Sequence, residues 1–587
     1  MILSTVDWVI IATFLVASLA IGLGVARKSG KNTAEFFLSG RNMPWWLLGV
    51  SMVATTFSAD TPNLVTDIVR QNGVSGNWVW WAFLLTGMLT VFVYARLWRR
   101  SGMLTDLEFY ELRYSGKPAA VVRGFRALYL GVFFNVMILA SVSLAAIKQG
   151  SVLLNLSPYE TVVIGAVVTV VYSAVGGLRG VLLTDFFQFI VAMVGSIAAA
   201  VVIVNLPEVG GLDALLSNES IRPKLNIFPE IGDTDAWIAL ILIPIAVQWW
   251  SVWYPGAEPG GGGYIAQRML SAKSEDHAVG ATLLFNVAHY ALRPWPWIMV
   301  ALASVVVFPE LTDLSEAFPN VDPAYLGHDL AYSAMLSYLP AGLLGLVVAS
   351  LIAAFMSTLS TQLNWGASYV VHDFYGRFIN PGASERKKVW IGRLTIVILM
   401  VLGGGFALVL SNALQAFNII LQVGAGTGLL FILRWFWWRI NAWSEVTAMV
   451  VSFAVAIYLQ VVHPALGFTP WSTSLQLVAG VAITTVAWVL VTYLTKPTDL
   501  DRLVSFYRLA RPGGPGWAAV LEKAPAALEG LEPRPAGTWT VPSGILAMVF
   551  GTMGVMLIWL YGVGVVVVSV PMMVGATKSA IADLEHR

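Results

Sequence analysis

The 587-residue sequence contains no cysteine and few charged residues. The absence of cysteine excludes disulfide bonds, thiolate nucleophiles, iron–sulfur clusters and cysteine-based zinc sites. Only 11% of the residues are charged and 57% are hydrophobic, so the chain has too little polar surface to coat a water-soluble globule. The 34 basic residues balance 33 acidic ones, which leaves no electrostatic footprint for a nucleic-acid partner. We therefore expect the lipid bilayer to solvate most of the surface.

Long apolar segments predict an all-α polytopic membrane protein. A helix needs about 20 mostly apolar residues to cross a bilayer, and about fourteen segments meet this requirement. Three of them exceed a plain crossing, and proline or glycine clusters in the first two, 45–71 and 236–266, predict broken helices. The predicted spans are 6–26, 45–71, 77–98, 124–150, 158–175, 181–205, 236–266, 277–308, 331–371, 390–410, 412–437, 443–463, 472–494 and 541–574.

The order of these spans predicts a 5+5 inverted repeat, since each half opens with an unusual helix. The first span reads as a retained helix, because no basic region precedes it and no small-residue cleavage site follows it. The expected domains are an N-terminal accessory helix (6–26), a first repeat (45–205), a second repeat (236–437), two accessory helices (443–494), a cytoplasmic linker (495–540) and a C-terminal accessory helix (541–574).

The distribution of basic residues predicts the orientation. Lysine and arginine collect on the cytoplasmic side of membrane proteins. With the N-terminus outside, most of the 34 basic residues fall in cytoplasmic loops, whereas the loops 206–235 and 309–330 carry only Arg222 and Lys224. We expect a multi-pass protein of the inner (plasma) membrane with an extracytoplasmic N-terminus, and nothing in the sequence requires an oligomer.

The first long span carries hydroxyl side chains, Asp60 and Pro62 inside an otherwise apolar helix. Pro62 lacks an amide donor and frees a carbonyl one turn earlier, near Ser58. Exposed carbonyls within a membrane are tolerated only where something binds them or water reaches them. A hard monovalent cation would satisfy them. The alternative is a proline kink whose hydroxyls bond back to their own helix.

A second hydroxyl cluster lies in the span 331–371 and consists of Ser357, Thr358, Ser360 and Thr361. Ser357 and Thr358 face about 100° apart on a helix, so they can bracket one ion together with the carbonyl of Ala354, one turn earlier. The two clusters together predict a cage of uncharged oxygens.

With these motifs the sequence resembles the sodium/solute symporter family over roughly residues 6–500, and this family shares the LeuT-type inverted repeat. The resemblance implies that sodium is bound by the carbonyls of Ala54, Phe57 and Ala354 and by the hydroxyls of Ser357 and Thr358. The stretches that carry it are Ala54–Ser58, Ala354–Thr358, Glu35–Arg41, Pro44–Trp46, Gly176–Gln188 and Gln267–Lys273.

The resemblance also implies a second sodium site in some members, formed by an acidic residue that corresponds to Asp185 and by hydroxyls that match Ser360 and Thr361. The alternative for Asp185 is a solvated carboxylate at a helix end, paired with Arg179.

The solute site is expected at mid-membrane between the two broken helices. Arg293 is the informative residue, because an arginine at this depth needs a partner carboxylate or an anionic solute. Glu258, Asp60 and Asp67 are the candidate partners. The predicted solute-binding residues are Thr56, Ser58, Asp60, Trp253, Tyr254, Glu258, Asn286, His289, Arg293 and Gln422.

The expected function is sodium-coupled symport of a small polar organic solute by alternating access. Sugar-carrying relatives place a carboxylate on the second core helix, and the stretch 78–86 has none, so a carboxylate or amino-acid-like solute is favoured over a sugar. A proton-coupled carrier using Asp60 and a membrane sensor are the alternatives. An enzyme is not expected, because the sequence has no HExxH, GxSxG or P-loop motif.

Overall fold

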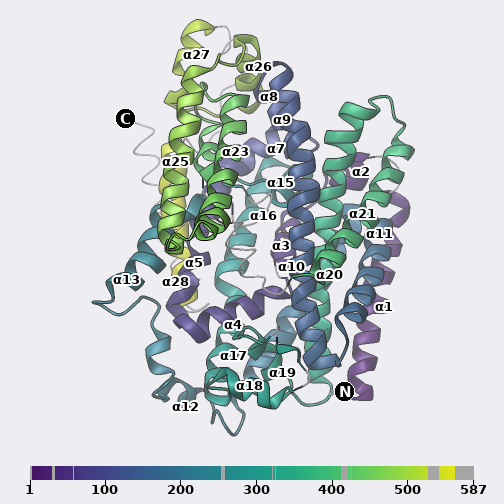
Figure 1. Cartoon of the computed structure of the whole chain (residues 1–587). Helices are drawn as coiled ribbons and strands as arrows, with labels where there is room; N and C mark the ends of the chain where they lie inside the picture. The colour runs from purple at the N-terminus through teal and green to yellow at the C-terminus, as the bar shows by residue number, and fades with distance from the viewer. Residues whose placement is uncertain are drawn as a thin grey trace.

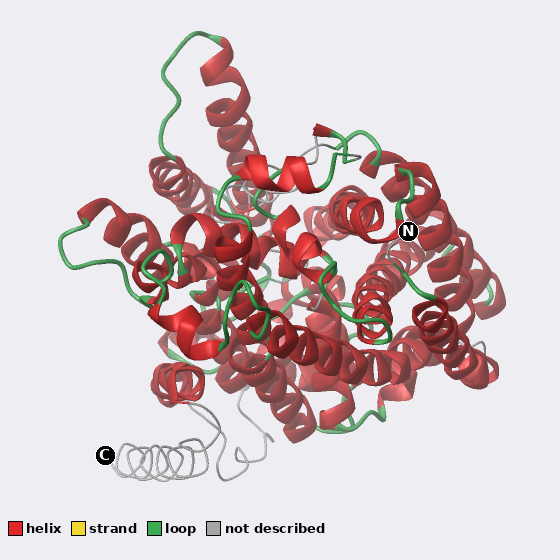
Figure 2. Cartoon of the chain, turned by 90° about the horizontal axis from the view of Figure 1, so that it is seen from below, coloured by secondary structure: helices red, strands yellow, loops and turns green. Residues whose placement is uncertain are grey.

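The computed structural model describes residues 3–29, 33–56, 58–252, 258–319, 321–323, 326–410, 421, 424, 426–525 and 541–561. Within these residues the chain consists of helices and loops, and the only pairing of extended backbone is an isolated bridge between Met43 and Ala272. Most helices run along one direction (Figure 1), and many are seen nearly end-on in the view from below (Figure 2). The predicted all-helical class is confirmed.

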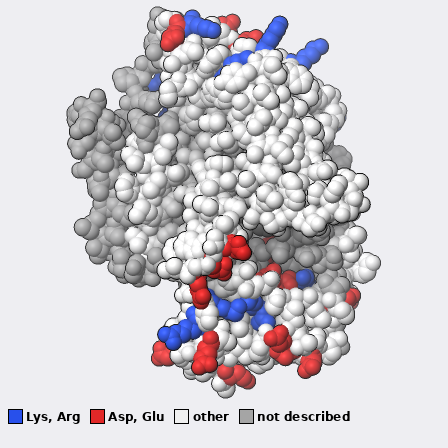
Figure 3. All heavy atoms as spheres, turned by 60° about the vertical axis from the view of Figure 1, so that its left-hand side comes forward, with Lys and Arg blue, Asp and Glu red and all other residues white. Residues whose placement is uncertain are grey.

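Charged side chains gather at the two ends of the molecule, and a wide uncharged band separates them on the face drawn in Figure 3. Large apolar side chains are exposed along the helices; examples are Val401, Val450 and Val486. An apolar belt of this kind is stable in contact with hydrocarbon and costly in contact with water. The chain is a multi-pass membrane protein.

Eight helices of the described chain are long and apolar enough to cross a membrane. These are Val74–Ser101, Gly116–Leu154, Leu178–Val204, Glu275–Val307, Leu343–Ile379, Glu385–Ala407, Ala442–Ala465 and Thr473–Leu494. Shorter apolar helices cover Thr5–Ile21, Trp45–Thr56, Pro158–Val170, Thr234–Ala246 and Ser543–Leu557. The predicted total of about fourteen spans, and the division into two repeats, stay predictions.

The first half of the chain contains the first interrupted helix, which is α3 followed by α4. The elements in order are α1 (Thr5–Ser29), α2 (Thr33–Leu38), η1 (Ser39–Arg41), α3 (Trp45–Thr56), α4 (Asp60–Asn72), η2 (Val74–Asn77), α5 (Trp78–Trp81), α6 (Leu84–Leu89), η3 (Thr90–Tyr94), α7 (Ala95–Ser101), η4 (Asp106–Glu108), α8 (Phe109–Arg113), α9 (Gly116–Leu128), η5 (Tyr129–Phe134), α10 (Asn135–Gln149), η6 (Gly150–Leu154) and α11 (Pro158–Val204). The helix α11 contains both predicted spans, 158–175 and 181–205, and the apolar segments Pro158–Val170 and Leu178–Val204 named above are its two parts.

The second half contains the second interrupted helix, from α13 to α15. Its elements are α12 (Leu212–Ser217), η7 (Arg222–Leu225), α13 (Thr234–Ala236), η8 (Trp237–Leu242), α14 (Ile243–Ala246), η9 (Gln248–Trp250), α15 (Gly263–Ser271), α16 (Glu275–Val287), η10 (Ala288–Leu292), α17 (Pro294–Val307), α18 (Leu311–Ala317), α19 (Leu330–Leu336), α20 (Leu343–Ser368), η12 (Tyr369–Ile379) and α21 (Glu385–Ala407). The long predicted span 331–371 is interrupted: a turn containing Pro340 separates α19 from α20, and Gly342 has a φ of 86° there.

The remaining elements follow helix 426–433. They are α23 (Ala442–Ile457), η13 (Tyr458–Val462), α24 (His463–Ala465), α25 (Thr473–Leu494), α26 (Leu500–Ala510), η14 (Pro515–Trp517), α27 (Ala518–Lys523) and α28 (Val541–Tyr561).

The N-terminal helix α1 packs against α11 and α20. The carboxylate of Asp7 accepts the backbone N–H groups of Gly342 and Gly345, each at 2.7 Å. These amides belong to the start of α20, where a helix has unsatisfied donors and favours a negative charge. Asp7 therefore fixes α1 to α20, the helix that carries the second hydroxyl cluster.

The predicted 495–540 linker is partly a packed element. Residues 500–523, here called the cap segment, form α26, η14 and α27 and pack against α7 and α8. The Trp517 side chain is fully buried and donates its indole N–H to the Trp435 carbonyl at 2.9 Å. The guanidinium of Arg113 lies over the rings of Phe506 and Trp517. The cap segment therefore contacts two regions that are distant in sequence, α7–α8 and the chain around Trp435.

Replacing Trp517 with alanine should lower the thermal stability of the protein in detergent. Truncating a buried tryptophan costs about 3 to 5 kcal/mol, and here it also removes a ring beneath Arg113. The melting temperature of the purified variant is the measurement. Trp443→Ala is the matched control, because Trp443 is 50% exposed on α23. Equal melting temperatures for the two variants would contradict a structural role for the cap segment.

Candidate functional site

The first long helix is broken where the sequence predicted it. α3 ends at Thr56 and α4 begins at Asp60, which places Pro62 in the first turn of α4, where a missing amide donor is tolerated. Carbonyls at the end of α3 have no partner within the helix. Within the break, the carbonyl of Ala59, which directly precedes α4, accepts a hydrogen bond of 2.6 Å from the side chain of Gln149 on α10, a residue that the sequence did not indicate.

The predicted sodium-binding segments lie side by side. The hydroxyl of Thr358 on α20 donates to the Thr55 carbonyl of α3 at 2.8 Å. Ala54, Ala354 and Ser357 are buried in the same region. Phe57 lies outside the described residues. The contact joins α20 to the end of α3, which is the arrangement that a shared ion would need, and the ligand assignments themselves stay predictions.

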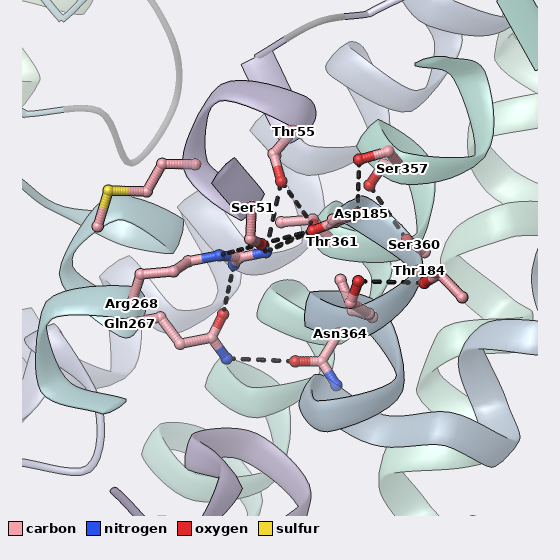
Figure 4. Close-up of polar contacts among 12 residues, drawn as sticks. Ser51, Thr55, Thr184, Asp185, Gln267, Arg268, Ser357, Ser360, Thr361 and Asn364 are labelled. Atoms are coloured by element: carbon pink, nitrogen blue, oxygen red, sulfur yellow. Dashed lines mark hydrogen bonds and ion pairs between the residues drawn. The ribbon is translucent and has the colours of Figure 1, made fainter. Parts of the chain in front are cut away.

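Asp185 is fully buried on α11 and accepts two short hydrogen bonds (Figure 4). The Ser357 hydroxyl donates to it at 2.6 Å, and the Ser51 hydroxyl of α3 donates at 2.5 Å. Its ion-pair partner is Arg268 on α15, at 3.7 Å, and not Arg179. The alternative of a solvated helix-end carboxylate is therefore wrong.

The side chain of Arg268 on α15 is fully buried. Its guanidinium donates to the hydroxyls of Thr361 at 2.8 Å and of Ser51 at 3.1 Å, as drawn in Figure 4. The Thr361 hydroxyl also lies 3.0 Å from that of Thr55. Ser360 donates to the Ser357 carbonyl of its own helix at 3.1 Å. Arg268 thus connects the second broken helix to the first.

A second polar cluster surrounds the end of α3. His289 Nδ1 lies 3.0 Å from the Thr56 hydroxyl, and the Arg293 guanidinium donates to the same hydroxyl at 3.3 Å and to the Val53 carbonyl at 3.4 Å. All of these side chains are buried. The sequence predicted that Thr56, His289 and Arg293 share a site, and the structure brings them together at the first break.

Arg293 has no carboxylate within 4.0 Å among the residues that the structure describes. Asp60, half-buried in the first turn of α4, attracts it electrostatically from farther away. Ser58 is buried in the break between α3 and α4. The buried cation therefore faces hydroxyl, imidazole and carbonyl groups.

Glu258 does not pair with Arg293, which corrects one predicted alternative. Its carboxylate is ion-paired with Arg126 and, at 2.8 Å, with Arg434. Glu258 and Arg126 line a pocket whose wall also contains Val252. The carboxylate therefore faces Arg126 on α9 and Arg434, which directly follows helix 426–433, instead of η10.

Asn286 packs against another helix. Its side-chain nitrogen donates to the Thr282 carbonyl at 2.8 Å, and its side-chain oxygen occupies the space that a Cβ at Gly87 would fill. Buried amides of this kind join helices in membrane proteins. The structure thus does not bring Asn286 to the cluster around Arg293.

The second break is held by close backbone contacts. The Thr86 hydroxyl donates to the Trp249 carbonyl. A Cβ added at Gly428 would overlap the carbonyl oxygen of Trp250, and one at Gly424 would overlap that of Val252. Small residues four apart let a helix approach another backbone closely. The predicted residues Trp253, Tyr254 and Gln422 lie outside the described residues.

A membrane bundle with two interrupted helices and buried polar groups at the breaks has the architecture of secondary transporters, which bind cargo where helices are discontinuous. The chain belongs to the sodium:solute symporter family, whose model matches residues 36–452. It is a transporter and not an enzyme.

Two relatives of known function have similar sequences. The sodium/glucose cotransporter of Vibrio parahaemolyticus is 26% identical over 473 residues, covering 78% of this chain and 86% of the relative. The sodium/mannose cotransporter of Bos taurus is 26% identical over 498 residues, covering 79% and 80%. A solved structure of a Na⁺-coupled sialic acid symporter has a TM-score of 0.70 at 20% identity and covers 84% of this chain and 99% of its own. This similarity shows the LeuT-like fold.

Proposed function

We propose that the chain imports a small polar organic solute that carries a carboxylate, and that it couples this import to sodium bound by the carbonyls of Ala54, Phe57 and Ala354 and the hydroxyls of Ser357 and Thr358. Family membership supports sodium-coupled symport. The hydrogen bond from Thr358 to the Thr55 carbonyl supports the location, because it joins the two segments that would share the ion.

Sodium would act as a link between two helices that separate during transport. An ion held by both α3 and α20 binds only the arrangement in which they are adjacent, so its occupancy shifts the population toward that state. The solute site at Thr56 lies on the same helix end as Ala54. Ion and solute would therefore stabilise one another's binding by a reciprocal coupling free energy.

The buried guanidinium of Arg293 carries the proposal of an anionic solute. It lies beside Thr56 and His289 at the first break, with no carboxylate within ion-pair distance in the described structure. A charge buried at this depth is stabilised by a counter-charge. A solute carboxylate would provide it, and the Thr56 hydroxyl and His289 would bind further polar groups of the solute.

A sugar is the second candidate, because the relatives from Vibrio parahaemolyticus and Bos taurus are named as sugar cotransporters. Against it, the stretch 78–86 offers no carboxylate for sugar hydroxyls, and Trp80 instead packs against His289 with ring centroids 5.9 Å apart. Family membership favours sodium over the proton-coupled alternative.

The proposed location is the inner (plasma) membrane with the N-terminus outside. The charge distribution supports this orientation, since the loops around α12 and α18 carry few basic residues.

A thermal-shift screen identifies the solute class. Purified protein is heated with small carboxylates, amino acids or sugars, each in sodium chloride and in choline chloride. Because a ligand that binds the folded state raises the melting temperature, we expect carboxylates to stabilise the protein only in sodium. Stabilisation by sugars alone would support the second candidate, and stabilisation that is equal in choline would contradict sodium coupling.

A further inference from the structure

The guanidinium of Arg268 lies among the residues that the family resemblance assigns to a second sodium ion. That predicted site consists of Asp185, Ser360 and Thr361. Arg268 donates to the Thr361 hydroxyl at 2.8 Å and forms an ion pair with Asp185 at 3.7 Å. Figure 4 shows the arginine reaching from α15 between α3 and α20 to this point.

The oxygens at this predicted second sodium site already form hydrogen bonds within the protein. Ser51 accepts from Arg268 at 3.1 Å and donates to Asp185 at 2.5 Å, and Ser357 donates to the other carboxylate oxygen at 2.6 Å. Thr361 accepts from Arg268, and Ser360 is bonded to its own helix. A sodium ion here would have to share the Thr361 hydroxyl and the Asp185 carboxylate with the guanidinium.

The charges lead to the same conclusion. Asp185 and Arg268 are both fully buried, with one negative and one positive charge. A second sodium ion beside Thr361 would lie within a few ångströms of the guanidinium, and like charges repel strongly in the low dielectric of a membrane interior. The site is therefore balanced by a cation that belongs to the chain.

We propose that Arg268 takes the place of a second sodium ion, so that the transporter binds one sodium ion per chain. This rests on the proposed sodium site at Ala54, Ser357 and Thr358. Arg268 is attached to α15, so this internal cation also ties the second broken helix to the first while Asp185 holds the Ser357 hydroxyl.

Equilibrium binding of radiolabelled sodium to the purified full-length protein tests the proposal with sodium alone as the probe. We expect one saturable sodium ion per chain in the wild type. Two saturable ions per chain would overturn the role of Arg268, and no saturable sodium would instead contradict the proposed function, so the two failures are distinguishable.

Variants of Arg268 provide a second test of the proposal, again by the number of sodium ions bound per chain. Arg268→Gln should raise the count from one to two sodium ions per chain, Arg268→Lys should keep it at one, and the double variant Arg268→Gln with Asp185→Asn should return it to one. A folded Arg268→Gln protein that still binds one ion would overturn the proposal. If Arg268→Gln does not fold, the wild-type count decides.

Discussion

Replacing Arg293 with glutamine should lower the uptake of a carboxylate solute by about 100-fold, because loss of one partner of a buried charge pair costs on the order of 2 to 5 kcal/mol. The guanidinium is fixed by Thr56 and by the Val53 carbonyl at the end of α3, so it presents its charge at the first break. Arg293→Lys should restore only part of the activity, since lysine keeps the charge and lacks the planar fork that matches a carboxylate. The measurement is kcat/KM in proteoliposomes.

Arg70→Gln is the matched control for removal of a buried arginine. Arg70 is also buried, but it donates to the carbonyls of Ser304 and Phe308, away from the first break. We expect carboxylate uptake by this variant to stay within a few-fold of the wild type. Full activity in Arg293→Gln would show that the solute does not depend on this cation, and the sugar candidate would then be favoured.

Replacing Ser357 with alanine should raise the half-saturating sodium concentration by about 10- to 100-fold, since a hydrogen bond to a charged group contributes roughly 1.5 to 3 kcal/mol. The change removes a proposed sodium ligand and also the donor that bonds to Asp185 at 2.6 Å. At saturating sodium, uptake should recover toward the wild-type rate. The measurement is the sodium dependence of solute uptake.

Ser350→Ala is the control for this variant. Ser350 is buried on the same helix, and its hydroxyl donates only to the Val347 carbonyl, at 2.7 Å. Its half-saturating sodium concentration should equal that of the wild type. An unchanged value in Ser357→Ala would show that α20 does not contribute this ligand.

The residue types in short stretches of the sequence predicted the break between α3 and α4 and the hydroxyl cluster on α20. Pro62 cannot continue a hydrogen-bonded helix, and a run of hydroxyls inside an apolar span indicates buried polar function, so α3, α4 and the cluster on α20 could be expected. The meeting of Thr56, His289 and Arg293 followed from placing both segments at mid-membrane. These features depend on short stretches of chain.

Pairings across the fold could not be predicted in the same way. Arg268 follows a break of unknown angle, so the sequence alone does not decide whether it turns into the bundle or out to water. The pairing of Glu258 with Arg126 and Arg434 could not be predicted for the same reason. The cap segment did carry a signal: Leu503, Phe506, Tyr507 and Ala510 recur at the spacing of an amphipathic helix and are all buried. Its proline and glycine content hid that signal.

Sodium coupling is tested by solute uptake into proteoliposomes, measured at one fixed pH with an inward gradient of sodium chloride or of choline chloride. We expect the vesicles to concentrate the solute only with the sodium gradient, and to lose the accumulation when sodium is equal on both sides. Equal accumulation with the choline chloride gradient would contradict sodium coupling.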